Sequence, residues 1–307
     1  MIPPNAAAPH IFTLTGNLLA ERTLNFETWT AGQTQRATSE SFQVGGKGIN
    51  VAKMLRRLGA PATALCFSGG ASGAECESWL TARGLVHHTF ATSASTRTGT
   101  VVRSGGFAET TFLGPDNAPD AAAIVACAEF LQAQPAGSVL AVCGSLPGWN
   151  SGSFAPLRAV LHRWPERGPL IVDTYGSALA WFANESTSFI RINRTEFVSL
   201  FPPAEQKRSG GELLQLARDR FQVLRWAVSD GAAPVWFSAD HHAPETILPP
   251  KVRQVSATGS GDVMLACVLH ARFHRGLSWR ESVVAALPAA AANAAHAGVA
   301  EFPAPIG

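Results

Sequence analysis

Hydrophobic residues follow two different spacings along this chain. From about residue 45 onward, short apolar runs bounded by turn residues alternate with longer segments whose apolar positions recur every three or four residues. The first pattern is typical of buried strands and the second of helices that cover a sheet. The predicted strands are 64–67, 139–143, 170–173, 189–192, 226–229 and 235–238. The predicted helices are 51–58, 74–83, 121–132, 154–162, 211–221, 263–272 and 279–297. This alternation predicts a parallel sheet covered by helices.

Two stretches interrupt the alternation. Residues 22–43 and 88–113 contain strand-like patterns and glycine turns but no helix-like pattern. The last predicted helix, 279–297, is so rich in alanine that it must pack closely against the sheet or a neighbouring helix. The chain therefore combines a large α/β unit with smaller segments of β-structure.

Composition narrows the class of partner. The 307 residues can bury a substantial core, and the formal net charge of +2 shows no strong acidic or basic bias. Because no dense run of Lys and Arg occurs, we expect no nucleic-acid partner and no anionic membrane partner. A small-molecule partner is the expectation that remains.

Cysteine usage and the chain's beginning predict a cytoplasmic protein. The five cysteines are scattered and form no Cys-x-x-Cys pair, so they are interpreted as reduced packing residues. The first nine residues lack the basic start and apolar core of an export signal. No uncharged apolar stretch is long enough to cross a bilayer, so we expect no membrane insertion.

The most informative segment lies late in the chain, at Thr258-Gly259-Ser260-Gly261-Asp262. Val252 and Val255 suggest a strand that arrives at this turn, and 263–269 is interpreted as a buried helix that leaves it. Free N–H groups of the first helical turn can bind a phosphate, and glycines let it approach the backbone. Asp262 could then accept the proton of an attacking hydroxyl. On its own the string is weak evidence, because any strand–helix turn uses glycine and Asp is common in a first helical turn.

A second glycine cluster lies about two hundred residues earlier, at Gly45-Gly46-Lys47-Gly48-Ile49-Asn50-Val51-Ala52. It also runs into a helix, whose apolar face continues at Leu55 and Leu58. Lys47 is the one charged residue among these glycines, and the chain has few other lysines. It is interpreted as an anion contact, the alternative being a solvated turn lysine.

Together these motifs resemble the ribokinase-like PfkB family of carbohydrate kinases. Residues 45–52 are similar to the first signature of the family and residues 257–262 to its second. Between them, in the family's order, lie Thr96-Arg97, Gly144-Ser145-Leu146-Pro147, Asp173 with Gly176 and Leu179, Asn193-x-x-Glu196, and Ser229-x-Gly231-Ala232. Motifs that are weak singly become strong in this order. Within the family, the chain is most similar to the phosphosugar branch of 1-phosphofructokinases and tagatose-6-phosphate kinases.

The resemblance implies a three-layer α/β/α core with a mainly parallel central sheet and a small β-sheet lid. Residues 1–15, 44–88 and 114–307 would form the core, and residues 16–43 and 89–113 the lid. In the family such a lid covers the substrate and often forms a dimer contact, so we expect a homodimer through the lid. Phe26, Trp29, Phe90 and Phe112 would be exposed on one chain and buried by its partner, the alternative being that they cover the core below.

The resemblance also assigns the substrate side of the site. Arg36, Lys47 and Arg97 would gather at the cleft between lid and core, where Ser145 adds a hydroxyl donor. Three cations suit the phosphate of a phosphorylated sugar. The alternative is that each arginine is a surface charge with its own carboxylate partner. The other residues expected on this side are Asn17, Glu21, Gly45, Gly46 and Asn50.

The nucleotide side is expected to hold ATP and Mg²⁺. Asn193 and Glu196 would position waters around the metal ion, while Asn193 as a helix N-cap with Glu196 completing the capping box is a compatible alternative. Arg191, which stands where the family usually has Lys, would meet the ATP phosphates. The other residues expected near the nucleotide are Ser229, Gly231 and Asn293.

Three departures from the family pattern unsettle the substrate more than the reaction. Glu21 stands where the phosphosugar branch usually has Asp, so its contact with sugar hydroxyls must shift. Ser256 replaces an Asp or Asn that often supports a monovalent-cation loop, which puts potassium activation in doubt. Pro234 replaces a late glycine beside the nucleotide.

The sequence therefore predicts ATP-dependent phosphoryl transfer to a hydroxyl of a sugar phosphate. Asp262 would be the base, and the N–H groups of Gly259, Ser260 and Gly261 would neutralise the transferring group. Fructose 1-phosphate is the favoured acceptor, ahead of tagatose 6-phosphate and fructose 6-phosphate, by resemblance to the branch. Two alternatives stay open: a kinase of an unphosphorylated sugar or nucleoside on the same fold, and a sensor of sugar phosphate or nucleotide without catalysis.

Overall fold

The computed structural model describes residues 8–105, 109–239 and 243–303. Within them, a nine-stranded sheet has the order β13-β12-β11-β10-β9-β8-β1-β4-β5. The pairs between β12 and both of its neighbours are antiparallel, and the other pairs are parallel. In chain order the strands of this sheet are β1 (Ile11–Thr15), β4 (Ala62–Ser68), β5 (His87–Ala91), β8 (Val139–Cys143), β9 (Leu170–Asp173), β10 (Phe189–Asn193), β11 (Arg225–Asp230), β12 (Ala233–Ala239) and β13 (Glu245–Ile247).

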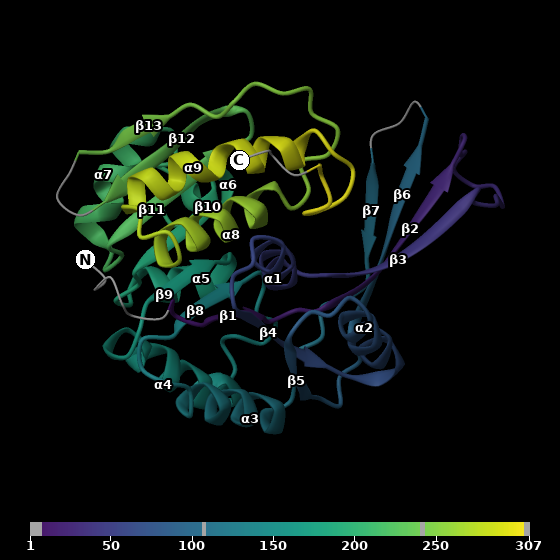
Figure 1. The fold of residues 1–307 in the computed structure, drawn as a ribbon, viewed down its shortest axis with the longest axis horizontal. Coiled ribbons are helices and arrows are strands. Elements are labelled where there is room, and N and C mark those ends of the chain that lie inside the picture. Colours follow the sequence, from purple (N-terminus) through teal and green to yellow (C-terminus); the bar gives the residue numbers. More distant parts are fainter. Residues whose placement is uncertain (1–7, 106–108, 240–242, 304–307) are drawn as a thin grey trace.

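Helices cover both faces of this sheet, because alternate residues of each buried strand point to opposite sides. Leu140 and Val142 of β8, for example, belong to one apolar cluster, while Val139 and Ala141 belong to another. One face packs α3 (Ala121–Gln132), α4 (Ala155–Arg163), α5 (Gly176–Ala183), α6 (Arg194–Val198) and α7 (Gly210–Arg220). The other packs α1 (Lys47–Arg57), α2 (Gly70–Ala82), α8 (Ser260–Phe273) and α9 (Trp279–Ala294). Figure 1 shows α3 and α4 on one side of the sheet and α8 and α9 on the other.

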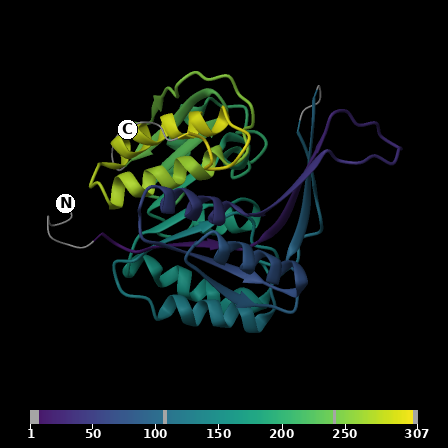
Figure 2. The ribbon, with the colours of Figure 1, turned by 45° about the vertical axis from the view of Figure 1, so that its right-hand side comes forward.

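A separate four-stranded sheet, here called the lid, has the order β3-β2-β6-β7. Its strands are β2 (Leu19–Phe26), β3 (Ser39–Gly45), β6 (Arg97–Ser104) and β7 (Thr110–Leu113). The lid projects from one side of the core in both ribbon views (Figures 1 and 2). The predicted three-layer core with a mainly parallel sheet and a small β-sheet lid is confirmed.

The order of the strands determines where a ligand site is expected. From β1 the chain adds β4 and β5 on one side, then returns to build β8, β9, β10 and β11 on the other. The carboxyl ends of β1 and β8 therefore meet at the point where the direction of winding reverses. Ligands of open α/β sheets bind at such a point, because the two flanking connections diverge there.

Local structure contradicts two of the predictions. β5 pairs in parallel with β4 at the edge of the large sheet, although residues 89–91 were assigned to the lid. Phe90 consequently lies in the core, 3% exposed, and is not available to a partner chain. The strand expected before Thr258 is absent from the described structure, where Val252 and Val255 are exposed on an irregular segment.

The positions of the cysteines agree with the interpretation that they are packing residues. All five cysteines, Cys66, Cys76, Cys127, Cys143 and Cys267, are buried and unbonded to one another, as expected of packing residues. Burial raises the pKa of the Cys76 and Cys267 thiols to about 12, so both remain protonated and unreactive near neutral pH. Within the described residues, every helix is too short or too polar to cross a lipid bilayer.

Candidate active site

The glycine turn before α8 leads into the N-terminus of a helix, where backbone N–H groups without a partner in the helix can bind an anion. Gly259 is the N-cap of α8 and has a φ of 72°, a left-handed conformation that glycine adopts without a Cβ clash. A Cβ at Gly261 would lie within 1.9 Å of the Nη1 of Arg191, so only glycine lets that guanidinium lie against the turn. The Arg191 guanidinium therefore lies next to the first turn of α8. Both favour the negative charge of a phosphoryl group.

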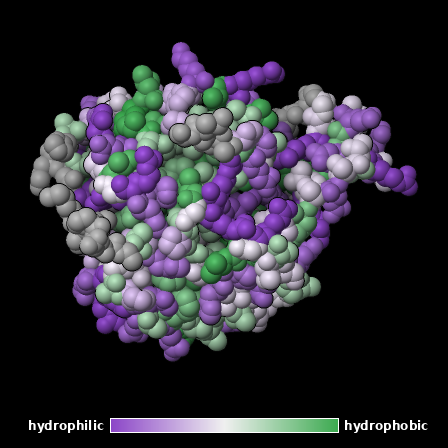
Figure 3. Space-filling view, viewed as in Figure 1, coloured by the Kyte–Doolittle hydropathy of each residue, from purple (hydrophilic) through white to green (hydrophobic). Residues whose placement is uncertain are grey.

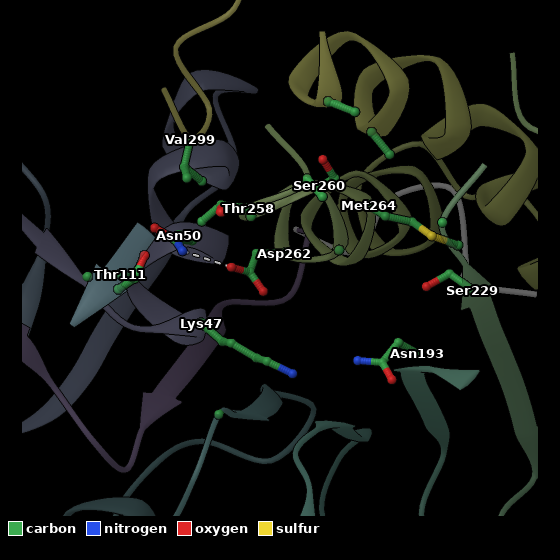
Figure 4. A pocket seen from close by; sticks show the side chains of 18 of the residues that line it. Lys47, Asn50, Thr111, Asn193, Ser229, Thr258, Ser260, Asp262, Met264 and Val299 are labelled. Atoms are coloured by element: carbon green, nitrogen blue, oxygen red, sulfur yellow. Dashed lines mark hydrogen bonds between the residues drawn. The ribbon is translucent and has the colours of Figure 1, made fainter. Parts of the chain in front are cut away.

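Asp262 lies in the first turn of α8 and is 5% exposed. Asn50 of α1 donates a hydrogen bond from Nδ2 to the Asp262 Oδ2 at 2.7 Å, drawn as a dashed line in Figure 4. Burial, together with the nearby negative charge of Asp173, raises the pKa of Asp262 to about 7. A carboxylate that titrates near neutral pH can accept a proton at working pH and release it afterwards.

Four charged residues, Asp173, Lys47, Arg191 and Glu196, form a network beside Asp262. Asp173, at the end of β9, is fully buried and accepts hydrogen bonds from Lys47 Nζ at 2.7 Å and from Arg191 Nη1 at 3.0 Å. Lys47 also donates to Glu196 Oε1 at 2.9 Å. Burial alone would raise the pKa of Asp173, but the charges of Lys47 and Arg191 outweigh it and lower that pKa. Asp173 is therefore ionised at neutral pH and holds both cations in place.

Lys47 lies between the two halves of the site. Burial lowers the pKa of Lys47, but the carboxylates of Asp173 and Glu196 outweigh burial and raise it, so the ammonium stays charged. Figure 4 shows its side chain directed into the space between Asp262 and Asn193. The prediction placed Lys47 on the substrate side alone, whereas one of its two carboxylate partners is Glu196, which the same prediction placed on the nucleotide side.

A cluster of polar side chains lies at the base of the lid. Asn17, just after β1, donates from Nδ2 to Asp116 Oδ1 at 2.8 Å and to Ser145 Oγ at 2.9 Å. Arg97, at the start of β6, donates from Nη1 to the same Asp116 oxygen at 2.7 Å. On β2, Glu21 accepts a hydrogen bond from Gln43 Nε2 of β3. These groups can bind hydroxyl and phosphate oxygens of a polar ligand.

A cavity of about 910 Å³ lies between the lid and the core. On each lid strand it is the odd-numbered residues that line it, because alternate side chains of a strand point to one face. Met264 and Ser229, both labelled in Figure 4, line the cavity on the side of α8 and β11. The apolar part is lined by Val235, Pro249, Met264, Leu287, Ala290, Ala291 and Ala294. The predicted site residues that line the cavity are Asn17, Glu21, Gly45, Gly46, Lys47, Asn50, Arg97, Ser145, Arg191, Asn193, Glu196, Ser229, Gly231, Gly259, Ser260, Gly261 and Asp262.

Arg36 and Asn293 are the two predicted site residues that the cavity does not include. Arg36 is exposed on the loop from β2 to β3, which projects at the far end of the lid in Figure 1. The seven residues of β3 extend between Arg36 and the glycine cluster, and at about 3.3 Å per residue they hold the two about 20 Å apart. The expectation that Arg36 joins Lys47 and Arg97 in the cleft of its own chain is therefore wrong.

Asn293 is fully buried behind the glycine turn. Its Nδ2 donates to the Thr258 carbonyl at 3.0 Å and to Ser260 Oγ at 3.2 Å, and its Oδ1 accepts from the Ala300 N–H at 2.9 Å. Because the amide is fully buried and satisfied by the protein, Asn293 is not available to a nucleotide, contrary to the expectation that it lies beside one. It supports the turn instead.

Two acidic residues were given no role in the sequence analysis. Asp173 was noted as part of a motif, and Asp116 was not noted at all. Each follows a feature that could have drawn attention to it: Asp173 ends a buried parallel strand, and Asp116 stands where the lid returns to the core. Their cationic partners, however, come from distant parts of the chain.

Oxygen donors for a divalent cation are present at the end of β10. Asn193 caps α6 in a capping box with Glu196, which confirms that alternative as a structural feature. Glu196 Oε1 also accepts from Lys47, and both residues line the cavity. Carboxylate and amide oxygens suit Mg²⁺, which keeps several waters and takes few protein ligands. Within the described residues no cluster of three or more potential ligands offers a self-sufficient metal site.

Comparison with known proteins identifies the family. A model of the pfkB family of carbohydrate kinases matches residues 15–306. The chain is 26% identical over 295 residues to the 1-phosphofructokinase of Borreliella burgdorferi, covering 95% of this chain and 94% of that protein. It is 31% identical over 276 residues to the 1-phosphofructokinase of Haloferax volcanii, covering 87% of this chain and 85% of that protein.

A solved structure supports the same assignment of fold. The tetrameric inhibited form of phosphofructokinase-2 from Escherichia coli is similar with a TM-score of 0.81 and 24% identity, covering 94% of each chain. The fold is therefore ribokinase-like. Because the family model spans nearly the whole sequence, this chain belongs to the pfkB family of carbohydrate kinases.

Proposed function

We propose that this protein transfers the γ-phosphoryl group of ATP to a hydroxyl of a sugar phosphate, with a ketohexose phosphate such as fructose 1-phosphate as the favoured acceptor. The observation that carries the proposal is the position of Asp262. Its carboxylate lies behind a glycine turn and faces a cavity shared with Asn17 and Arg97. A base, an anion pocket and a polar acceptor site thus share one cavity.

Asp262 takes the proton of the acceptor hydroxyl as that oxygen attacks the γ-phosphorus of ATP. The bond from the γ-phosphorus to the bridging oxygen breaks, and ADP leaves. The N–H groups of Gly259, Ser260 and Gly261 stabilise the charge on the transferring group, with the Arg191 guanidinium beside them. Lys47, held by Asp173 and Glu196, adds a fixed positive charge between acceptor and donor.

ATP is assigned to the side of the cavity formed by β10, β11, α8 and α9. Ser229 lies near the end of β11 and Gly231 follows that strand, so both suit a position beside the phosphates. The apolar lining from α8 and α9 suits the base. Asn193 and Glu196 would hold Mg²⁺ together with water and nucleotide oxygens, where the ion would neutralise phosphate charge.

The acceptor is assigned to the side formed by β1, β8 and the lid. Asn17, Glu21 and Ser145 offer hydrogen-bonding groups for sugar hydroxyls, and Arg97 offers a guanidinium for a phosphate. The relatives named 1-phosphofructokinase favour a ketohexose phosphate among the candidates. Their identities of 26% and 31% support the class of acceptor more than a single compound.

The test is ADP release from Mg-ATP across a panel of free sugars, nucleosides and hexose phosphates. We expect turnover with one phosphorylated ketohexose and a loss of about 10²-fold to 10⁴-fold in Asp262→Asn, the contribution typical of a positioned base. Binding of ATP to the variant, measured by calorimetry, shows that its site is intact.

Other results would identify the alternatives. Turnover confined to a free sugar or nucleoside, with an Arg97→Met variant unchanged in KM, would replace the phosphosugar acceptor with an unphosphorylated one. Binding of ATP or sugar phosphate without turnover, equal in wild type and Asp262→Asn, would indicate a sensor.

A further inference from the structure

We infer that Asp116 is a positioning residue of the acceptor site, whose carboxylate orients Asn17 and Arg97 for the substrate. The inference rests on the proposed function for the identity of the acceptor. Its geometric basis is independent of which acceptor binds.

One carboxylate oxygen connects three separate segments. Asp116 Oδ1 accepts from Asn17 Nδ2 at 2.8 Å and from Arg97 Nη1 at 2.7 Å. Asn17 follows a core strand, Arg97 begins a lid strand, and Asp116 lies between β7 and α3, where the chain returns from the lid to the core. The contact therefore sets the place of a lid residue relative to a core residue.

Asp116 acts from outside the cavity. Asn17 and Arg97 both line it, whereas Asp116 does not, and the Asp116 side chain is 51% exposed. Arg97, by contrast, is 13% exposed and has Asp116 as its single ion-pair partner in the described structure. A long side chain with one charged contact takes its orientation from that contact.

Asp116 Oδ1 also determines the orientation of the Asn17 side-chain amide. Both hydrogens of Nδ2 are used, one by Asp116 and the other by Ser145 at 2.9 Å. The reversed amide would set its oxygen against a carboxylate, which is repulsive. Asn17 Oδ1, which has no hydrogen bond within the described residues, is thus left as the acceptor for a substrate hydroxyl.

The Asp116 carboxylate also changes the net charge around Arg97. It offsets part of the positive charge of Arg97, so it costs some attraction for a phosphate while it supplies orientation. If Asp116 mainly orients its partners, removing its charge weakens acceptor binding. If it mainly offsets the charge of Arg97, removing its charge strengthens acceptor binding, so the affinity of the variant discriminates between the two effects.

The experiment compares wild type with Asp116→Asn and Asp116→Glu. If Asp116 positions its partners, Asp116→Asn raises the KM for the acceptor about tenfold, leaves the KM for ATP unchanged and changes kcat by less than about threefold. Asp116→Glu restores part of the loss, because it keeps the charge. A half-exposed loop residue is replaced without loss of folding, which a melting curve checks. Asp219→Asn on α7, another change of an exposed carboxylate, is the matched control and has no effect.

A double-mutant cycle with Arg97→Met tests the route of the effect. When Asp116 acts through Arg97, Asp116→Asn costs distinctly less in the Arg97→Met background than in wild type. An equal cost in both backgrounds would overturn the route through Arg97.

Two further outcomes would overturn the inference. One is an unchanged acceptor KM in Asp116→Asn. The other is a lower acceptor KM, which would make Asp116 a competitor of the substrate phosphate.

Failure of this inference can be distinguished from failure of the proposed function. If wild type turns over only an unphosphorylated sugar, the proposed acceptor is wrong. The KM for that sugar still tests Asp116 through Asn17, and an unchanged value would overturn the inference.

Discussion

Asp262 illustrates how one residue acquires its chemistry from its surroundings. The first turn of α8 buries its carboxylate, and the charge of Asp173 lies close by, so that the pKa of Asp262 is raised to about 7. Asn50 opposes this effect, because its hydrogen bond favours the charged form. The balance keeps the carboxylate ionised above neutral pH and able to accept a proton.

We expect kcat/KM to fall as the pH falls below about 7, since the protonated Asp262 cannot act as a base. Asn50→Ala removes the hydrogen bond that favours the ionised carboxylate, and should therefore move this acid limb to higher pH. Rate profiles of the two proteins between pH 5 and 9 check the direction, with the buffer ionic strength held constant. A limb that stays in place or moves to lower pH in Asn50→Ala would contradict the assignment of Asp262.

At the scale of the element, α9 combines two tasks on different sides of one helix. Leu287, Ala290, Ala291 and Ala294 follow the spacing of one helical face and line the cavity. Asn293 lies on another side and supports the glycine turn. Small side chains on the cavity side leave room for a ligand, so the alanine content serves the cavity as well as the packing against α8.

A bulky residue on the cavity side of α9 should block the nucleotide. Ala290→Leu places extra methyl groups where the base is proposed to lie, and such overpacking costs about 1–3 kcal/mol. We expect ATP to bind at least about fivefold more weakly by calorimetry, while acceptor binding is unchanged. Ala285→Leu is the matched control, since Ala285 is exposed on the same helix. Equal losses in both variants would point to damage of the helix and not to the base site.

At the scale of the whole molecule, the lid is the part with the least support from its own chain. Its base packs against α2 through Leu18, Ala20 and Val44, while its far end extends from the core (Figure 2). Phe112 is 56% exposed on the outer strand β7. Elsewhere on the face drawn in Figure 3, hydrophobic residues form small groups among hydrophilic ones. Leu113, next to Phe112, is 53% exposed, so this edge of the projecting sheet offers apolar surface that a second chain could cover.

We therefore predict a homodimer formed through the lid. Sedimentation equilibrium at micromolar concentration should give twice the 32.3 kDa mass of one chain. Phe112→Glu should lower that mass, because a charge cannot be buried in an apolar contact without a partner. Val125→Glu, at an exposed apolar position of α3, is the control and should leave the mass unchanged. A single-chain mass for wild type would rule out the dimer, and an unchanged mass for Phe112→Glu would place the contact elsewhere.

The sequence by itself determined the two glycine turns and most of the strands and helices of the core, although β1, β13, α5 and α6 were not predicted. Strands β8 and β9 and helix α3 begin and end where they were predicted, because residue spacing and glycine conformation act over a few neighbouring positions. The same local signals placed Asp262 directly behind a glycine turn that opens a helix, and the structure starts that helix at Ser260. Resemblance to the family then predicted that the candidate site residues share one site, and most of them line the same cavity.

Only the tertiary structure decided which side chains meet. Lys47 bonds to Asp173 and Glu196, which lie 126 and 149 positions away, and no local pattern specifies such pairs. The fold likewise buried Asn293 behind the turn, held Arg36 away from the cavity and joined Asn17 to Arg97 through Asp116. These contacts follow from strand order and from the path of the lid, and they depend on packing across the whole chain, which residue spacing does not encode.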